Sequence, residues 1–165
     1  MRPVYINREV AEITGMKQQD VSRFSHYGMI IPTVSEGKGK GTNRIYSSSD
    51  VLKFILLPVF KEYGMSMAQI KRLFGLLQSD LFSPSNPFLY HGLPNKRAFV
   101  GVYDITKDDF TAAMSFEDDP ETCDPNYRES FEENLRTFTV DMLNHKSCFV
   151  IDITDCIRKL PVVEE

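Results

Sequence analysis

The sequence predicts a mostly α-helical protein with a small β wing: an N-terminal winged helix-turn-helix followed by a small α/β domain. Three observations lead to this prediction. Two short amphipathic segments joined by a glycine turn occupy residues 7–28. A glycine- and lysine-rich stretch at 35–43 lies between short apolar segments, as the tip of a β-hairpin does. In the C-terminal half, apolar stretches typical of strands alternate with helical patterns.

The first helix is expected to begin at Asn7, because asparagine is an effective helix cap. Apolar side chains then recur at Val10, Ala11 and Ile13 until Gly15 breaks the pattern. A turn of three to four residues containing this glycine leads to the next helix, which is the arrangement of a helix-turn-helix.

The second helix is expected from about residue 18 to residue 27, with Val21 and Phe24 facing inward and Gly28 ending it. In a helix-turn-helix, this second helix enters the major groove of DNA. Polar side chains on it and just before it can reach phosphates and base edges. The predicted DNA-contacting residues of this segment are Lys17, Gln18, Gln19, Ser22, Arg23 and His26.

The segment after this helix predicts a wing. Residues 29–32 are interpreted as a strand that leaves the helix, residues 35–43 as the flexible tip, and residues 44–46 as the returning strand. A basic hairpin after a helix-turn-helix follows the phosphate backbone or enters the adjacent minor groove, whereas the alternative is an ordinary solvated turn. The residues expected to neutralise phosphates are Lys17, Lys38, Lys40 and Arg44.

Two further helices are expected after the wing. Hydroxyl and carboxylate side chains at 47–50 predict the start of the third helix, and Gly64 its end. Pro58 lies inside this helix and is expected to kink or split it. Ser66 and Gln69 form a capping box for the fourth helix. The apolar side of that helix comprises Ile70, Leu73, Phe74 and Leu77.

The charge of the chain is divided unevenly along its length. Residues 1–75 carry 11 Lys and Arg against 6 Asp and Glu, a charge of +5. Residues 76–165 carry 8 against 17, a charge of −9, so the overall −4 hides a basic half. This split is typical of a DNA-binding head joined to a domain that does not bind DNA, although unevenly scattered surface charge would give the same totals.

The C-terminal half is expected to form a small acidic domain. The predicted division is 1–77 for the winged helix-turn-helix, 78–96 for a linker or ordered loop, and 97–165 for the α/β domain. The linker is too apolar for a free tether, so we expect part of it to pack; its apolar residues are Phe82, Phe88, Leu89 and Tyr90. The predicted elements of the domain are a strand at 98–105, an acidic loop at 117–124, a helix at 126–143, a strand at 147–153 and a last helix capped by Thr154 with Ile157 and Leu160 inward.

Four stretches of the first half, in this order, resemble the MerR family of bacterial regulators. They read YINREVAEITGMKQQDV, FSHYGMIIP, GTNRIYSSSDVLKF and YGMSMAQIKRLF, and the similarity extends over residues 4–77, just under half of the chain. The resemblance implies a winged helix-turn-helix of four helices that binds palindromic operators as a homodimer. It also implies DNA-contacting positions, which are Arg44 and Tyr46 in the wing and Gln18, Gln19, Ser22, Arg23 and Phe24 in the recognition helix.

The sequence departs from this family in two places. Family members usually have Leu-Arg-Tyr-Tyr-Glu where this chain has Val-Ser-Arg-Phe-Ser at 21–25, so Arg23 is displaced by one position, about 100° around a helix. The family also continues into a long dimerising coiled coil. Here the segment after Leu77 contains Pro84, Pro87, Gly92 and Pro94. Dimerisation is therefore expected through the C-terminal half, or not in the manner of the family.

No catalytic or metal site is predicted. The three cysteines, Cys123, Cys148 and Cys156, have irregular spacing and lie apart from the positions where family members bind metals. The chain has no phosphate-binding glycine loop and no nucleophile elbow, so we expect neither an enzyme nor a cofactor. No apolar run has the length of a membrane span, and a cytoplasmic location is expected.

These observations together favour a transcriptional regulator that binds double-stranded DNA sequence-specifically. Gln18, Gln19 and Ser22 are the candidates for reading bases, because glutamine can bind adenine through two hydrogen bonds. The acidic half would dimerise the protein, bind a small-molecule effector or contact another protein. Two alternatives remain open: a phage or mobile-element protein such as an excisionase or small terminase subunit, and a protein-interaction adaptor that no longer binds DNA.

Overall fold

The structure, a computed structural model, describes residues 3–37, 43–84, 86, 89, 96–103, 110–118 and 149–161. The chain divides into two compact units, which are described separately below. The first unit comprises residues 1–92 together with 156–165, and the second comprises residues 93–155. The terminal residues 156–165, which the sequence assigned to the C-terminal domain, thus group with the N-terminal half.

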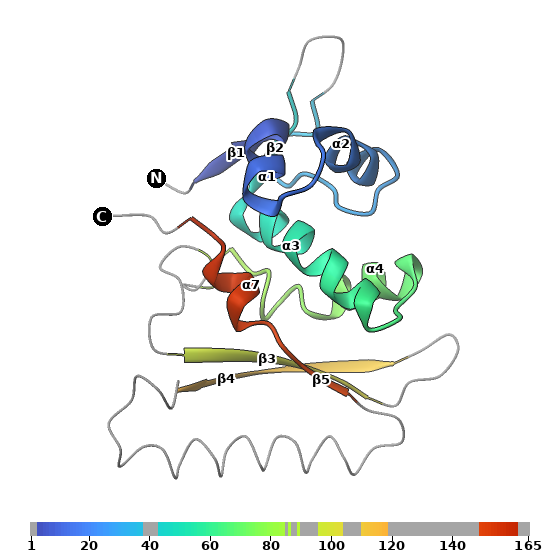
Figure 1. Cartoon of the computed structure of the whole chain (residues 1–165), viewed down its shortest axis with the longest axis vertical. Coiled ribbons are helices and arrows are strands. Elements are labelled where there is room, and N and C mark those ends of the chain that lie inside the picture. The colour runs from blue at the N-terminus through green and yellow to red at the C-terminus, as the bar shows by residue number, and fades with distance from the viewer. Residues whose placement is uncertain are drawn as a thin grey trace. The chain divides into compact units, whose positions relative to one another are not determined.

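The first unit begins with a short strand, which is followed by the two predicted short helices (Figure 1). Strand β1 (Val4–Ile6) leads into α1 (Asn7–Thr14), and α2 (Gln18–His26) follows after a turn. Gly15 ends α1 at φ 71°, a left-handed conformation that glycine adopts without steric cost. The predicted capping role of Asn7 is wrong, because Ile6 holds the cap position and its N–H donates to the Glu9 carboxylate at 2.9 Å.

The strand predicted at 29–32 does not form. The N–H groups of Met29 and Ile30 both donate to the Phe24 carbonyl, at 2.9 and 3.4 Å, so they complete the end of α2 and cannot pair with another strand. The returning strand does form, as β2 (Ile45–Ser47), but its main partner is the N-terminal strand β1. These two strands are antiparallel, with Tyr5 opposite Tyr46.

Helices α3 (Ser48–Glu62) and α4 (Met67–Leu76) start at the predicted caps. The Ser47 and Ser66 hydroxyls accept hydrogen bonds from backbone N–H groups three residues later, and Asp50 and Gln69 complete the two capping boxes. Pro58 lies inside α3 without splitting it, so one of the two outcomes predicted for this proline does not occur.

The core of the first unit is aromatic and aliphatic. The Phe60 and Phe74 rings lie 6.2 Å apart, and those of Phe74 and Phe82 lie 5.5 Å apart in an edge-to-face contact. Phe82 and Leu89 are buried, which confirms that the apolar linker packs. Phe88 and Tyr90 lie outside the described residues.

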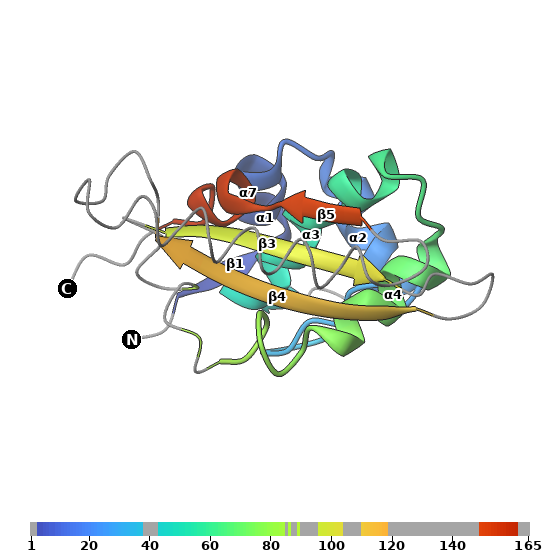
Figure 2. The ribbon, with the colours of Figure 1, turned by 90° about the horizontal axis from the view of Figure 1, so that it is seen from below.

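The second unit contains a three-stranded antiparallel sheet. Strand β3 (Lys96–Tyr103) is central, and it pairs with β4 (Thr111–Asp118) and β5 (Phe149–Asp152) (Figure 2). Val100 lies opposite Met114 on one side and Ile151 on the other. Strands β3 and β5 confirm the two predicted strands, whereas β4 was not predicted and includes the start of the expected acidic loop. Outside the described residues lie the rest of that loop, the helix expected at 126–143, and the cysteines Cys123 and Cys148.

The last described helix follows directly on β5. Helix α7 (Thr154–Arg158) has Thr154 as its first residue, and the threonine hydroxyl accepts a hydrogen bond from the Ala98 N–H at 2.9 Å. Ile157 and Leu160 are buried, as predicted. Among the described residues, no helix combines the length and the apolar character that crossing a bilayer requires.

Candidate nucleic-acid interface

Helix α2 presents a polar face to solvent. At about 100° per residue, Gln18, Gln19, Ser22 and His26 fall on one side of the helix. Gln18, Gln19 and His26 are exposed, as is Lys17 at the N-cap, and Ser22 is half-buried. Val21 and Ser25, on the neighbouring side of the helix, are buried. The structure therefore brings five of the predicted contact residues together on one accessible surface.

A network of hydrogen bonds fixes this helix against α1 and β2. The Asn7 amide donates to the Ser22 hydroxyl at 2.8 Å, and the Tyr46 hydroxyl donates to the Asn7 amide oxygen at 2.8 Å. The Ser25 hydroxyl lies 2.9 Å from the same Tyr46 oxygen. The orientation of the recognition helix is thus tied to the strand that leaves the wing. Sequence reasoning missed the role of Asn7, because its partners lie 15 and 39 residues away.

Tyr46 is a buried structural residue. Its side chain is fully buried, and its ring packs edge-to-face against Phe54 at 5.6 Å. Burial raises the pKa of the Tyr46 phenol above its ordinary value, while the hydrogen bond with Ser25 acts in the opposite direction. The direct DNA contact predicted for Tyr46 does not fit this position, because the side chain has no accessible surface.

The base of the wing lies beside the recognition helix. Ser35 and Ile45 close the hairpin through two backbone hydrogen bonds of 3.1 and 2.9 Å. Residues from both elements line one groove of about 350 Å³, with Ser25 and His26 from α2 and Gly37 and Arg44 from the wing. Lys38 and Lys40 lie outside the described residues. Within the described part, the C-terminal end of α2 and the wing base thus line one groove.

Asp50 holds the segment before the wing against the start of α3. Its carboxylate accepts from the Thr33 N–H at 2.9 Å, from the Thr33 hydroxyl at 2.7 Å and from the Ser47 N–H at 3.0 Å. The carboxylate is fully buried. The sequence identified Asp50 as part of a helix start but gave no signal for its contact with Thr33.

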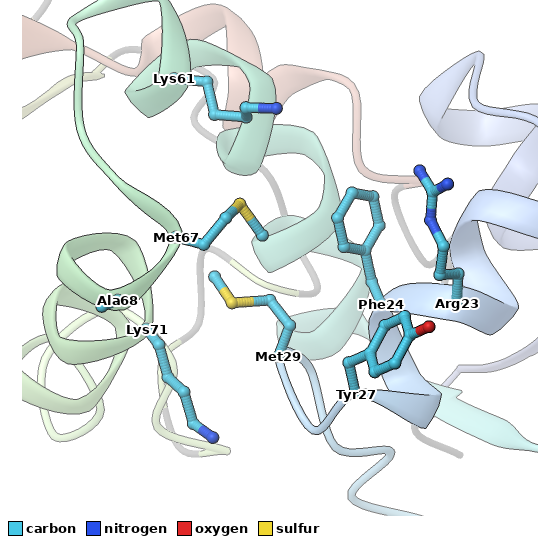
Figure 3. Close-up of a pocket in the computed structure, with 8 residues that line it drawn as sticks. All are labelled: Arg23, Phe24, Tyr27, Met29, Lys61, Met67, Ala68 and Lys71. Carbon is cyan, nitrogen blue, oxygen red and sulfur yellow. The ribbon is translucent and has the colours of Figure 1, made fainter.

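Arg23 points toward a different region from the glutamines. Its guanidinium pairs with Asp20 at 2.9 Å and lies 5.8 Å from the centre of the Phe24 ring. Both Arg23 and Phe24 line a cleft of roughly 450 Å³ between α2 and α4 (Figure 3). At its displaced position, Arg23 therefore pairs with Asp20 and lines the cleft.

The described residues offer no metal centre. Among them, no three His, Cys, Asp or Glu side chains lie close enough to share an ion. Cys156 is buried, a position in which cysteine packs as a small apolar side chain.

Comparison with known families identifies the segment that carries this interface. Residues 5–76 match the family model described as MerR HTH family regulatory protein. The matched segment includes α1, α2, the wing, α3 and α4. No curated protein matches the chain.

Proposed function

We propose that this chain, whose residues 5–76 form a MerR-type helix-turn-helix domain, is a transcriptional regulator that binds double-stranded DNA sequence-specifically. The family match supports the general part of this proposal, which is that the protein binds DNA and regulates transcription. The sequence preference, the contact residues and the assembly are inferences from the chain itself.

One observation carries the proposal: the C-terminal end of α2 and the base of the wing line the same groove, and His26 of the polar face belongs to it. An α-helix fits the major groove of B-DNA, and a hairpin beside it reaches the flanking backbone. Gln18 and Gln19 are exposed near the N-terminal end of α2, the part of a recognition helix that contacts base edges. Arg44, at the base of the wing, would hold a phosphate.

The roles of the remaining residues follow from the same placement. Lys17, Lys38 and Lys40 would neutralise phosphates with Arg44, so the affinity would fall as the salt concentration rises. Ser22 and His26 would contact the groove wall. Tyr46 and Asn7 would act indirectly, by holding α2 in its orientation.

We assign dimerisation or effector binding to the second half of the chain. The proline- and glycine-containing segment after Leu77 prevents the coiled coil that such regulators use to dimerise. The excess of negative charge in residues 76–165 makes that half a poor ligand for DNA. The regulator would act in the bacterial cytoplasm.

Selection from random DNA duplexes with the full chain, followed by anisotropy titrations at several salt concentrations, tests this proposal. We expect one enriched sequence, palindromic if the protein binds as a dimer. We also expect the logarithm of the affinity to fall linearly with the logarithm of the salt concentration. No enriched sequence together with no salt dependence would refute the proposal and favour a protein-interaction adaptor. Chromatin pull-down with sequencing would then identify the natural sites.

A further inference from the structure

The cleft between α2 and α4 is lined by none of the residues proposed to read bases, which are Gln18, Gln19 and Ser22. It lies within the first unit and has a volume of about 450 Å³, which falls within the roughly 300–1,000 Å³ typical of sites for small molecules. Three elements contribute to it: the end of α2, the end of α3 and the start of α4 (Figure 3). Its lining residues are Arg23, Phe24, Tyr27, Met29, Lys61, Met67, Ala68 and Lys71.

The floor of the cleft is apolar and adaptable. Phe24 and Tyr27 provide aromatic faces from α2 and its C-cap, and Met29 and Met67 lie between the two helices (Figure 3). Methionine side chains have three rotatable bonds and a polarisable sulfur, so they fit ligands of irregular shape. Tyr27 is 75% exposed, and its ring contacts His26 edge-on at 5.4 Å between ring centres, so most of its aromatic surface is accessible to a ligand.

The rim of the cleft is positively charged. Lys61 and Lys71 are exposed, and within the described part of the chain neither forms an ion pair or a hydrogen bond. Arg23 adds a third cation, although Asp20 partly compensates it. None of the eight lining residues is acidic. Two uncompensated ammonium groups beside an apolar floor attract a ligand with an anionic group and an apolar body.

We propose that this cleft binds a small organic anion, in which a carboxylate, sulfonate or phosphate group is attached to an aromatic or branched apolar body. The anionic group would contact the Lys71 ammonium, and the apolar body would rest on Phe24 and the two methionines, which lie between Lys71 and Lys61 at the opposite end of the cleft (Figure 3). Binding of the anion is independent of the proposed DNA binding. An effect of the anion on DNA affinity, transmitted through Arg23 and the end of α2, rests on that proposed function.

Fluorescence titration of the full chain with anilinonaphthalene sulfonate tests the site, because this probe joins a sulfonate to two aromatic groups. We expect saturable binding of one probe per chain. Phenylnaphthylamine, which has the same ring system without the sulfonate, should bind several-fold more weakly. Lys71→Gln should weaken probe binding by roughly three- to tenfold, the effect of losing one charge contact, and Lys61→Gln, at the opposite end of the cleft, should weaken it less.

Two further variants make the test specific to the cleft. Arg72→Gln removes a charge from the neighbouring position of α4, outside the lining, and should leave probe binding unchanged. Ala68→Phe should fill the cleft and abolish binding, and circular dichroism should show an unchanged fold because Ala68 is exposed. Equal binding of the neutral analogue, or equal effects of Lys71→Gln and Arg72→Gln, would overturn the proposal.

The DNA titration separates this proposal from the proposed function. If Lys61→Gln and Lys71→Gln weaken DNA binding but leave the probe affinity unchanged, the two lysines hold the DNA backbone and the anion site is refuted. If the protein binds the probe as predicted but has no affinity for DNA, the anion site stands and the proposed regulator does not.

Discussion

The Tyr46 hydroxyl connects three elements through two hydrogen bonds, and its ring lies against Phe54. Phenylalanine at this position keeps the ring but removes the only group that connects Ser25 to Asn7. Tyr46→Phe should therefore lower the free energy of unfolding by about 1–2 kcal/mol, because Asn7 and Ser25 each lose a partner. Urea unfolding followed by circular dichroism measures this loss. Tyr27→Phe, at a 75% exposed position, is the matched control and should change stability by less than about 0.5 kcal/mol.

Because the Tyr46 hydroxyl can ionise, we expect the stability of the protein to depend on pH. Burial raises the pKa of Tyr46 above the value of about 10 that an exposed tyrosine has in the unfolded chain. The stabilising contribution is fully present below pH 10 and is lost as the pH rises through the folded-state pKa. Wild-type stability should thus fall faster than that of Tyr46→Phe above about pH 10. The measurement is the difference between the urea midpoints of the wild type and Tyr46→Phe, taken at pH 8 and again above pH 10. Because both proteins contain Tyr5, whose pKa is also raised by burial, a change in this difference is due to Tyr46. A constant difference would contradict the prediction.

Arg44 is the described wing residue with the clearest expected contact to DNA. Arg44→Ala should weaken DNA binding by roughly 1–2 kcal/mol and reduce the salt dependence by about one unit, the loss of one phosphate contact. Anisotropy titrations from low to moderate salt measure both quantities. Lys159→Ala removes an exposed charge outside the helix-turn-helix domain and serves as control. Unchanged affinity and slope in Arg44→Ala would refute the wing assignment.

At the scale of elements, the start of α3 depends on one carboxylate. Asp50 accepts three hydrogen bonds from Thr33 and Ser47 while fully buried. Asp50→Ala would leave these donors without their acceptor and should cost about 2–3 kcal/mol of stability in urea unfolding. Asp80 is exposed and accepts from the neighbouring Ser79 hydroxyl, so Asp80→Ala should be nearly neutral. Equal losses in the two variants would show that the contact with Thr33 contributes nothing.

Elements with local signals were the predictable ones. The capping boxes at Ser47 and Ser66 depend on residues three positions apart, and glycines mark the ends of α1 and α2. Strand β4 has few β-branched residues and was missed, because it forms through an eight-residue register with β3 that a single segment cannot reveal. The strand predicted at 29–32 failed for a related reason. An apolar run does not show where its N–H groups will bond.

The candidate site was predictable to the same extent. The exposed polar residues of α2 follow from helical periodicity within one segment. The burial of Tyr46, the role of Asn7 and the cleft beside Arg23 all require residues from different elements to meet. The exposed candidates for reading bases could thus be chosen from the sequence, whereas the residues that hold α2 in place could not.

At the scale of the whole molecule, the end of the chain belongs to the first unit. Residues 156–165 group with residues 1–92, and Cys156, Ile157 and Leu160 are all buried. The helix-turn-helix unit is therefore completed by a segment about 60 residues beyond Gly92 in the sequence, after the residues of the second unit. We expect the N-terminal half to depend on this segment for its stability.

Deletion of residues 156–165 tests this dependence. Removing three buried apolar side chains should lower the free energy of unfolding by more than about 3 kcal/mol, because each leaves exposed the surface against which it packed. Urea unfolding followed at 222 nm, where the helices of the first unit contribute, measures the change. Deletion of residues 162–165 alone removes none of these buried side chains and is the control. If the longer deletion unfolds at the same urea concentration as the control, the winged helix-turn-helix is stable without the chain end. In that case the DNA titration can be carried out on the N-terminal half alone, where the acidic half no longer opposes binding.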